Sequence, residues 1–146
     1  MIGASMAVSN DLAVMLRSVP LFEGLEPKEL QAVLRCADEV RHAAGKAVVR
    51  EGGEGIGFHL ILDGEATVTQ GGRELRRLRP GDYFGDIALL DGQPRTATVT
   101  AQGPVRTLSI TAWNFKPLLI EHPAMAQKLL VELCRRLRNA EASIVH

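Results

Sequence analysis

Glycine is concentrated in the middle of this sequence, and that concentration limits what the chain can form. Ten of the fourteen glycines lie between Gly45 and Gly85. Glycine weakens helices and suits tight turns, so short strands separated by turns are expected here. Short segments with the length and composition of β-strands lie between these glycine turns, and further such segments follow them in the sequence. These segments are Ala47–Arg50, Phe58–Leu62, Ala66–Gln70, Glu74–Leu78, Thr96–Ala101 and Val105–Ile110.

The turn residues favour an antiparallel arrangement of these strands. Asp63-Gly64 between two apolar runs predicts a β-hairpin with a type I′ turn, in which both central residues have positive φ. A further strand is expected to end at Tyr83 and Phe84. Several short strands at regular spacing are typical of a sandwich, barrel or jelly roll.

Helical periodicity appears on both sides of the strand region. Asn10 is a candidate N-cap for a helix that ends before Pro20, and Pro27 suits the first turn of a second helix. Pro117 is expected to kink or restart a short helix after the strands, and Pro123 begins a long final helix. The predicted order is helices, then a β-roll, then helices.

Length and composition fit one packed domain. With 146 residues, 46% of them hydrophobic, the chain has apolar material for one core and little room for a second. We therefore predict a single domain over residues 1–146, with its core at about 14–140 and residues 1–8 disordered. Lys and Arg total 17, as do Asp and Glu, so no excess of positive charge favours a nucleic-acid partner.

Several other features are expected to have a structural explanation. The sequence contains no run of the length and hydropathy of a membrane helix, and no secretory signal at the amino terminus. Cys36 and Cys134 are expected to be buried free thiols, which suits the cytoplasm. Trp113 is expected to pack between the roll and the final helices. A cluster of four arginines is expected to form a solvated hairpin face: Arg73, Arg76, Arg77 and Arg79.

The stretch most informative about function runs from Phe84 to Ala97. Its residues are Phe-Gly-Asp-Ile-Ala-Leu-Leu-Asp-Gly-Gln-Pro-Arg-Thr-Ala. Gly85 lets the backbone approach a ligand closely, and residues 86–90 fit one short helical turn whose free amides attract an anion. Arg95 is the single basic side chain of the stretch, which favours a singly charged phosphate over a triphosphate. The sequence has no Gly-Lys-Ser/Thr, which excludes a nucleotide-hydrolysing P-loop.

This stretch resembles the phosphate-binding cassette of the cyclic nucleotide-binding domain family, which includes catabolite activator proteins, regulatory subunits of protein kinases and cyclic-nucleotide-gated channels. The resemblance extends over about residues 14–140. Outside the cassette it rests on an amino-terminal helical segment and on turn residues: Pro20, Leu21, Phe22, Leu25, Leu30, Gly45, Gly64, Gly81 and Asp82.

The resemblance implies a mainly β fold with flanking helices. It would be an eight-stranded β-roll, or jelly roll, with N-terminal helices, a short cassette helix and a C-terminal lid helix. It also implies a sensor or regulatory domain that binds cyclic AMP or cyclic GMP, uses no metal, and signals by movement of the final helix. The sequence does not choose between the two nucleotides, because Thr96 is compatible with either base.

The resemblance assigns roles to individual residues. Arg95 would pair with the exocyclic oxygens of the cyclic phosphate, because a planar guanidinium suits a bidentate contact. The amides near Ile87, Ala88 and Ala97 and the hydroxyl of Thr96 would complete the phosphate shell. On the final helix, the candidates to cap the base are Leu133, Arg136 and Leu137.

The start of the cassette departs from the family pattern. Phe84 and Gly85 are followed by Asp86, where the family usually has Glu. This acid would accept a hydrogen bond from the ribose 2′-hydroxyl. Because Asp is shorter by one methylene, the contact would be longer, bridged by water or lost. Asp86 also suits a second role, as the cap of its helical turn.

Three other functions compete with that of a nucleotide sensor. A metal-dependent enzyme on a jelly roll needs clustered His and carboxylate ligands. The four histidines form no His-x-His pair and the chain has no nucleophile motif, so no catalytic residue is predicted.

A transcription factor would need a helix-turn-helix after the final helix, and the sequence ends at His146. Direct DNA binding is therefore not expected. The chain is expected to be a stand-alone sensor or a fragment of a longer regulator. A degenerate pocket that binds another small anion, or serves as an interaction module, remains open.

The final helix carries a pattern that favours self-association. Apolar residues recur at alternating intervals of four and three, the a/d seam of a coiled coil: Ala126, Leu130, Leu133, Leu137, Ala140 and Ile144. A second apolar row, expected to face the β-roll, contains Met125, Leu129 and Cys134. We predict a homodimer through this helix, with packing inside one domain as the alternative.

Overall fold

The computed structural model describes residues 11–52, 57–93 and 96–145. The chain forms two compact units. One unit is the continuous segment Cys36–Lys116, and the other combines Met1–Arg35 with Pro117–His146. The expected disorder of residues 1–8 lies outside the described residues, and the single domain stays a prediction.

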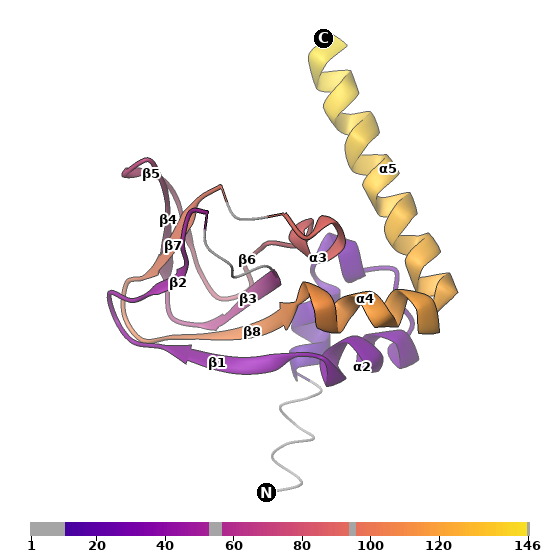
Figure 1. Ribbon diagram of the computed structural model, residues 1–146, viewed down its shortest axis with the longest axis horizontal. Helices are drawn as coiled ribbons and strands as arrows, with labels where there is room; N and C mark the ends of the chain where they lie inside the picture. Colours follow the sequence, from indigo (N-terminus) through magenta and orange to yellow (C-terminus); the bar gives the residue numbers. More distant parts are fainter. Residues whose placement is uncertain (1–10, 53–56, 94–95, 146) are drawn as a thin grey trace, which may run out of the picture. The chain divides into compact units, whose positions relative to one another are not determined.

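Within the described part of the chain, the unit Cys36–Lys116 is a β-roll of two antiparallel four-stranded sheets (Figure 1). This confirms the expected fold. One sheet has the order β1 (Asp38–His42), β8 (Val105–Thr111), β3 (Gly57–Asp63) and β6 (Tyr83–Phe84). The other has the order β2 (Ala47–Val49), β7 (Thr98–Ala101), β4 (Ala66–Gln70) and β5 (Arg73–Leu78).

Strand β1 is absent from the strands expected from the sequence. Its residues are Asp-Glu-Val-Arg-His, with a single apolar side chain, so the local pattern gives no strand period. Strand β1 forms because β8 offers it a complete antiparallel register, from Asp38 opposite Ser109 to His42 opposite Val105. The pairing partner, which is distant in sequence, therefore decides this strand.

The core of the roll lies where the two sheets face each other. It takes apolar residues from both sheets, and all of them are buried: Val49, Ile61, Ala66, Leu78, Val99, Ala101 and Val105. Phe84 packs against this cluster. Each large side chain buried in this way contributes roughly 1.5–3 kcal/mol, so the roll has a core of its own.

Two glycine turns show why the residues of this unit pair as they do. Gly71 and Gly72 both have positive φ, +58° and +80°, and join β4 to β5 in a two-residue hairpin. The hairpin expected at Asp63-Gly64 is wrong, because β3 and β4 belong to different sheets. Gly64 (φ +86°) is needed there because a Cβ would collide with the carbonyl oxygen of Pro104.

The second unit is helical. It contains a helix at residues 11–17, the 3-10 helix η1 (Pro20–Phe22), α2 (Pro27–Arg35) and α5 (Pro123–Val145), while α4 (Ala112–Glu121) runs from the roll into this unit. Its buried apolar side chains come from these helices and the residue before η1: Leu16, Val19, Leu21, Phe22, Leu30, Val33, Leu118, Met125 and Leu129. Lys128 of α5 donates a hydrogen bond of 2.7 Å to Glu29 of α2.

Helix α4 continues through Pro117, which costs one intrahelical hydrogen bond. The expected restart is therefore wrong, and the expected kink stays a prediction. Two further expectations for the helices are wrong. Trp113 is 65% exposed, because Phe115 takes the buried position of α4. Both cysteines are expected to be buried, but Cys36 is half-buried and Cys134 is exposed. At 100° per residue, Cys134 lies about 140° around α5 from the buried Leu129, so it is on another side of the helix.

No helix in the described ranges combines the length and hydropathy that crossing a bilayer requires.

Candidate functional site

The predicted cassette forms a tight corner between β6 and a single helical turn. Strand β6 ends at Phe84, and Gly85 has a φ of +85°, a conformation that glycine adopts without strain. The turn α3 (Ala88–Asp91) follows and ends at Gly92, whose φ is +67° and whose amide donates to the carbonyl of Ala88. The short helical turn expected at residues 86–90 is therefore present at Ala88–Asp91, after the predicted corner at Gly85.

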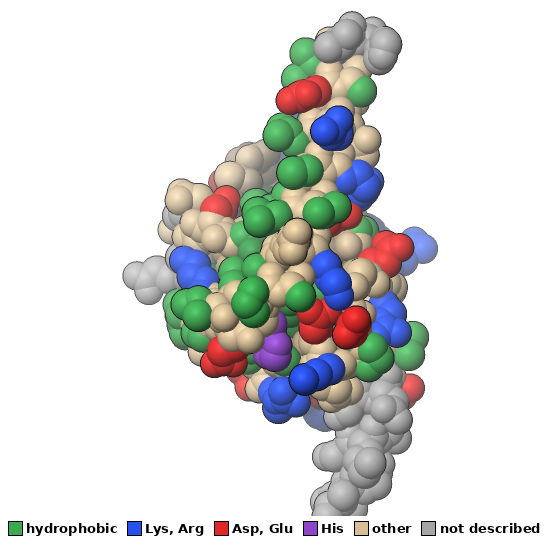
Figure 2. Space-filling view, turned by 90° about the vertical axis from the view of Figure 1, so that its right-hand side faces the viewer, with side chains coloured by type: hydrophobic (Ala, Val, Ile, Leu, Met, Phe, Trp, Pro, Cys, Tyr) green, Lys and Arg blue, Asp and Glu red, His purple; other side chains and the backbone are tan. Residues whose placement is uncertain are grey.

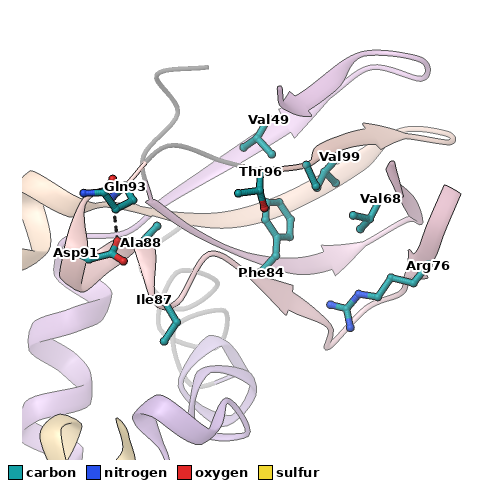
Figure 3. A pocket seen from close by; sticks show the side chains of 11 residues that line it. Val49, Val68, Arg76, Phe84, Ile87, Ala88, Asp91, Gln93, Thr96 and Val99 are labelled. Carbon is teal, nitrogen blue, oxygen red and sulfur yellow. Dashed lines mark hydrogen bonds between the residues drawn. The ribbon is translucent and has the colours of Figure 1, made fainter. Parts of the chain in front are cut away.

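The corner forms one side of a cavity of about 410 Å³ (Figure 3). Three valines from the adjacent strands β2, β7 and β4 of the second sheet give the cavity an apolar wall: Val49, Val99 and Val68. The remaining described lining comprises Phe84, Ile87, Ala88, Asp91, Gln93, Thr96, Ala97 and Arg76. All of these residues belong to the β-roll unit.

The structure brings together most of the site residues predicted from the sequence. The predicted residues that line the cavity are Phe84, Ile87, Ala88, Thr96 and Ala97. Gly85 shapes the corner between them. Arg95, the predicted phosphate ligand, lies outside the described residues.

Asp86 lies just before the cassette turn. Its side chain is buried, at 8% exposure, and lies outside the described lining of the cavity. Its Oδ1 accepts a hydrogen bond of 3.0 Å from the amide of Ile87, an amide that the family pattern would direct toward the phosphate. The N-cap of α3 is Ile87, and no side chain makes a cap hydrogen bond there, so Asp86 does not cap this helix. The ribose contact stays a prediction.

Arg76 is a lining residue that the sequence analysis assigned to a solvated hairpin face. It stands opposite Val68 in the register of β4 and β5, and its side chain is directed from β5 toward Phe84 (Figure 3). Its Nη2 donates a hydrogen bond of 3.3 Å to the carbonyl oxygen of Tyr83. Strand alternation counted back from the buried Leu78 places Arg76 on the inner face, so the sequence did contain a sign of this position.

Two further polar residues missed by the sequence analysis line the cavity at the end of α3. The amide of Gln93 donates a hydrogen bond of 2.9 Å to Oδ1 of Asp91 (Figure 3). This bond ties the chain just after α3 to the turn itself. The carboxylate of Asp91 adds negative charge to this side of the cavity, so an anion is favoured nearer to Thr96 and Ala97.

The candidates to cap the base lie on α5, in the helical unit. Leu133 and Arg136 are half-buried, and Leu137 is 61% exposed. Arg136 donates through Nε to Glu132 at 3.0 Å, and Arg135 donates to the same carboxylate at 2.7 Å. These bonds lower the pKa of Glu132 below its ordinary value, although its burial acts in the opposite direction. Within the described ranges, no group of three or more His, Cys, Asp or Glu residues could hold a metal ion.

Comparisons with known proteins agree with the geometry of the cassette. The sequence model of the cyclic nucleotide-binding domain matches residues 39–122. The chain is similar to the cAMP-dependent protein kinase regulatory subunit of Aspergillus niger, with 36% identity over 106 residues, which are 71% of this chain and 26% of that protein. It is also similar to a cGMP-dependent protein kinase of Toxoplasma gondii, with 40% identity over 87 residues, 60% of this chain and 9% of the kinase. The matched region is thus about a quarter or less of either relative.

A solved structure gives the same result. The N-terminal domain of a transcriptional regulator from Streptomyces coelicolor A3(2) superposes with a TM-score of 0.82 and 28% identity, covering 89% of this chain and 94% of that domain. The family match covers more than half of the 146 residues and includes every strand of the roll except the first residue of β1. The chain therefore belongs to the cyclic nucleotide-binding domain family.

Proposed function

We propose that this chain is a regulatory sensor that binds cyclic AMP or cyclic GMP in the 410 Å³ cavity of the roll. One observation carries the proposal. Phe84, Ile87, Ala88, Thr96 and Ala97, which the sequence assigns to a phosphate cassette, line one cavity together with an apolar wall. A cyclic nucleotide has the matching chemistry, a compact monoanion joined to a flat and largely apolar purine.

The phosphate binds on the side of the cavity where Thr96 and Ala97 lie. There the Thr96 hydroxyl and the amide of Ala97 are available as donors, and Arg95 supplies the bidentate guanidinium that the family pattern gives it. The purine then lies against Val49, Val68 and the other apolar lining, away from the carboxylate of Asp91. Binding rather than catalysis is the function that these groups support.

Arg76 adds a second basic side chain to this arrangement. Its bond to the Tyr83 carbonyl holds the guanidinium at the cavity without neutralising its charge. The whole-chain net charge is zero, so the local placement of Arg76 at the cavity is what favours an anion there. The relatives differ in the nucleotide that their names state, cAMP for the kinase regulatory subunit and cGMP for the kinase, and both nucleotides belong in the test.

Helix α5 supplies the output of the sensor by carrying a homodimer seam. Figure 2 shows apolar side chains along one side of this helix. Three seam residues at intervals of seven are largely exposed: Leu130 and Leu137 at 61% and Ile144 at 84%. A monomer gains nothing from these positions, whereas a coiled coil buries them. Ligand binding then shifts the population between positions of α5.

Calorimetric titration of the full chain with cyclic AMP and cyclic GMP tests the proposal. We expect at least one of them to bind with one site per chain. Arg95→Ala should remove most of the affinity, a loss of roughly 2–5 kcal/mol, because the phosphate charge loses its partner. Arg76→Gln should weaken binding about two- to fivefold, as expected for an exposed charge.

Arg77→Gln is the matched control, since Arg77 is the next residue of β5 and pairs with Glu74 on the exposed side. It should bind as the wild type does. A folded wild-type protein that binds neither nucleotide would contradict the proposal and favour the interaction module. Equal affinities for wild type and Arg95→Ala would remove the cassette from the site.

A further inference from the structure

A continuous chain of side-chain hydrogen bonds crosses three strands of the roll. Nε2 of His42 on β1 lies 3.3 Å from Oγ1 of Thr107 on β8. That hydroxyl lies 3.1 Å from Oγ of Ser109, and Ser109 lies 2.8 Å from Nδ1 of His59 on β3. We refer to these four residues as the histidine–hydroxyl chain. It joins one imidazole near the edge of the sheet to another at its centre.

The far end of this chain lies against the lining of the nucleotide cavity. His59 stands opposite Phe84 in the register of β3 and β6, and the two rings stack with centroids 4.9 Å apart and an interplanar angle of 17°. Phe84 lines the cavity. Thr107 is fully buried and stands opposite Ile61, a residue of the core between the sheets. The histidine–hydroxyl chain therefore runs along the inner face of the roll and ends behind a wall of the proposed ligand site.

The hydrogen bonds of the histidine–hydroxyl chain can run in either of two directions. If Nε2 of His42 carries its hydrogen, it donates to Thr107, which donates to Ser109, which donates to Nδ1 of His59. If instead Nδ1 of His59 carries the hydrogen, every bond runs the other way and Nε2 of His42 becomes an acceptor. Both directions satisfy the two hydroxyls, because each hydroxyl then donates once and accepts once along the chain.

Adding one proton to His59 leaves only one of these two directions. A protonated His59 donates from both ring nitrogens, so the chain must run from His59 to His42, and neutral His42 must take the Nδ1–H tautomer. If both rings were protonated, both would donate into the chain, and one hydroxyl hydrogen would have no acceptor within it. The buried chain therefore favours one added proton and opposes a second.

We propose that Thr107 and Ser109 couple the two histidines into a single-proton unit, and that a proton on His59 strengthens its stack on Phe84 and so favours the occupied ligand site. The inference rests on the proposed function for its second half only. An imidazolium over the face of a phenyl ring is attracted to it, and it also places positive charge behind the wall of a site for an anion.

The surroundings decide which ring takes the proton. Burial lowers the pKa of His42 below its ordinary value. Arg41 and Arg106, which line a cleft together with His42, oppose a second cation there, while Asp63 in the same cleft and Glu39, paired with Arg106 at 3.2 Å, reduce that opposition. Asp38 stands opposite Ser109 in the register of β1 and β8, and favours positive charge at the centre of the chain. Because these surroundings disfavour a proton on His42, we place the added proton on His59.

Nitrogen-15 NMR of the histidine rings, without ligand, tests the coupling directly. As the pH falls from about 8 to about 5.5, the spectrum of His42 should change to that of the Nδ1–H tautomer at the midpoint of the His59 titration. In Ser109→Ala and in Thr107→Val, which remove one hydroxyl each with little change of volume, the His42 tautomer should no longer respond at that midpoint. Ser109→Thr keeps a hydroxyl and should keep the response.

Titration of the nucleotide at both pH values tests the link to the ligand site. In the wild type and in Ser109→Thr, affinity should rise about two- to fivefold on acidification, the range for one partly screened charge near the bound anion. In Ser109→Ala the rise should be lost, because protonated His59 loses the Ser109 hydroxyl as the acceptor for its Nδ1–H. A His42 tautomer that ignores His59 in the wild type would overturn the coupling. An equal rise in Ser109→Ala would overturn its link to the site. A wild type that binds no nucleotide would instead refute the proposed function, while the NMR result would stand.

Discussion

The β-roll and the helical unit differ in how completely they bury their apolar side chains. In the roll, Ile61 and Val105 belong to the core between the two sheets and are 0% and 2% exposed. In helix α5, Met125 and Leu129 are buried, but Leu130 and Ile144 remain 61% and 84% exposed. The roll buries its core within its own 81-residue segment Cys36–Lys116, whereas the helix keeps an apolar row on its surface.

The difference has a physical origin. A strand that is covered on one face needs apolar residues only at alternate positions, and two facing sheets cover them completely. A helix docked on one side needs one stripe, and α5 has two. The buried stripe accounts for the helical unit itself, and the exposed stripe then has a role only outside it. This comparison can be tested in either unit.

The largest effect is expected at the exposed stripe. Leu130→Glu combined with Leu137→Glu should convert a dimer into a folded monomer, because four leucines leave the interface and each contributes roughly 1.5–3 kcal/mol when buried. Light scattering measures the mass, and circular dichroism checks the fold. The thermal stability of the roll should change little.

The matched control adds the same charges elsewhere on the helix. Asn139→Glu combined with Ser143→Glu places two carboxylates at exposed positions off the stripe and should leave the dimer intact. If light scattering finds the wild type monomeric with and without nucleotide, the exposed stripe is not a dimer seam, and α5 does not differ from the roll in needing a partner.

The next effect concerns the charged pair that ties α5 to α2. Burial raises the pKa of Glu29, but hydrogen bonds from Lys128 and from the amide of Glu26 outweigh it, and the pKa lies below its ordinary value. Lys128→Met should lower the free energy of unfolding by about 1.5–2 kcal/mol at neutral pH, near the low end for a bond to a charged group because the lysine side chain is 36% exposed. Urea unfolding measures this loss.

The stability that the Glu29–Lys128 pair contributes depends on pH, and its direction follows from the lowered pKa of Glu29. A carboxylate with a lowered pKa in the folded state adds stability above its ordinary pKa and loses it as the pH falls through the lowered value. The difference between wild type and Lys128→Met should therefore be complete above about pH 5 and shrink in stronger acid. Lys28→Met, at the exposed residue before Glu29, should show no such difference.

The smallest effect is expected in the roll, at Asp86. Asp86→Glu should raise cyclic nucleotide affinity by about 1 kcal/mol: a ribose hydrogen bond to a charged group is worth roughly 1.5–3 kcal/mol, and giving up the bond from the Ile87 amide costs about 1 kcal/mol. Calorimetric titration measures the gain. Asp82→Glu lengthens an exposed carboxylate that accepts from the amide of Arg79, and should change nothing. An Asp86→Glu protein that binds as the wild type does would leave Asp86 only as the acceptor for the Ile87 amide.

Residues close together in the sequence were enough to determine the cassette and the type of fold. Gly85 and Gly92 permit their positive φ values through their own lack of a Cβ, and the glycine-rich middle of the chain favours turns wherever it is placed. These are local properties of the backbone. For this reason the short strands, the cassette turn and the family could be inferred before any pairing was known.

The tertiary structure alone decided which strands pair and where a side chain ends up. Strand β3 pairs with β6 and β8 instead of β4, β1 exists because β8 lies beside it, and Asp86 accepts a hydrogen bond from the amide of Ile87. Pairing brings together residues far apart in sequence, such as His42 and Thr107 or Arg76 and Phe84. The free energy of such contacts depends on distance in space, which no local pattern records.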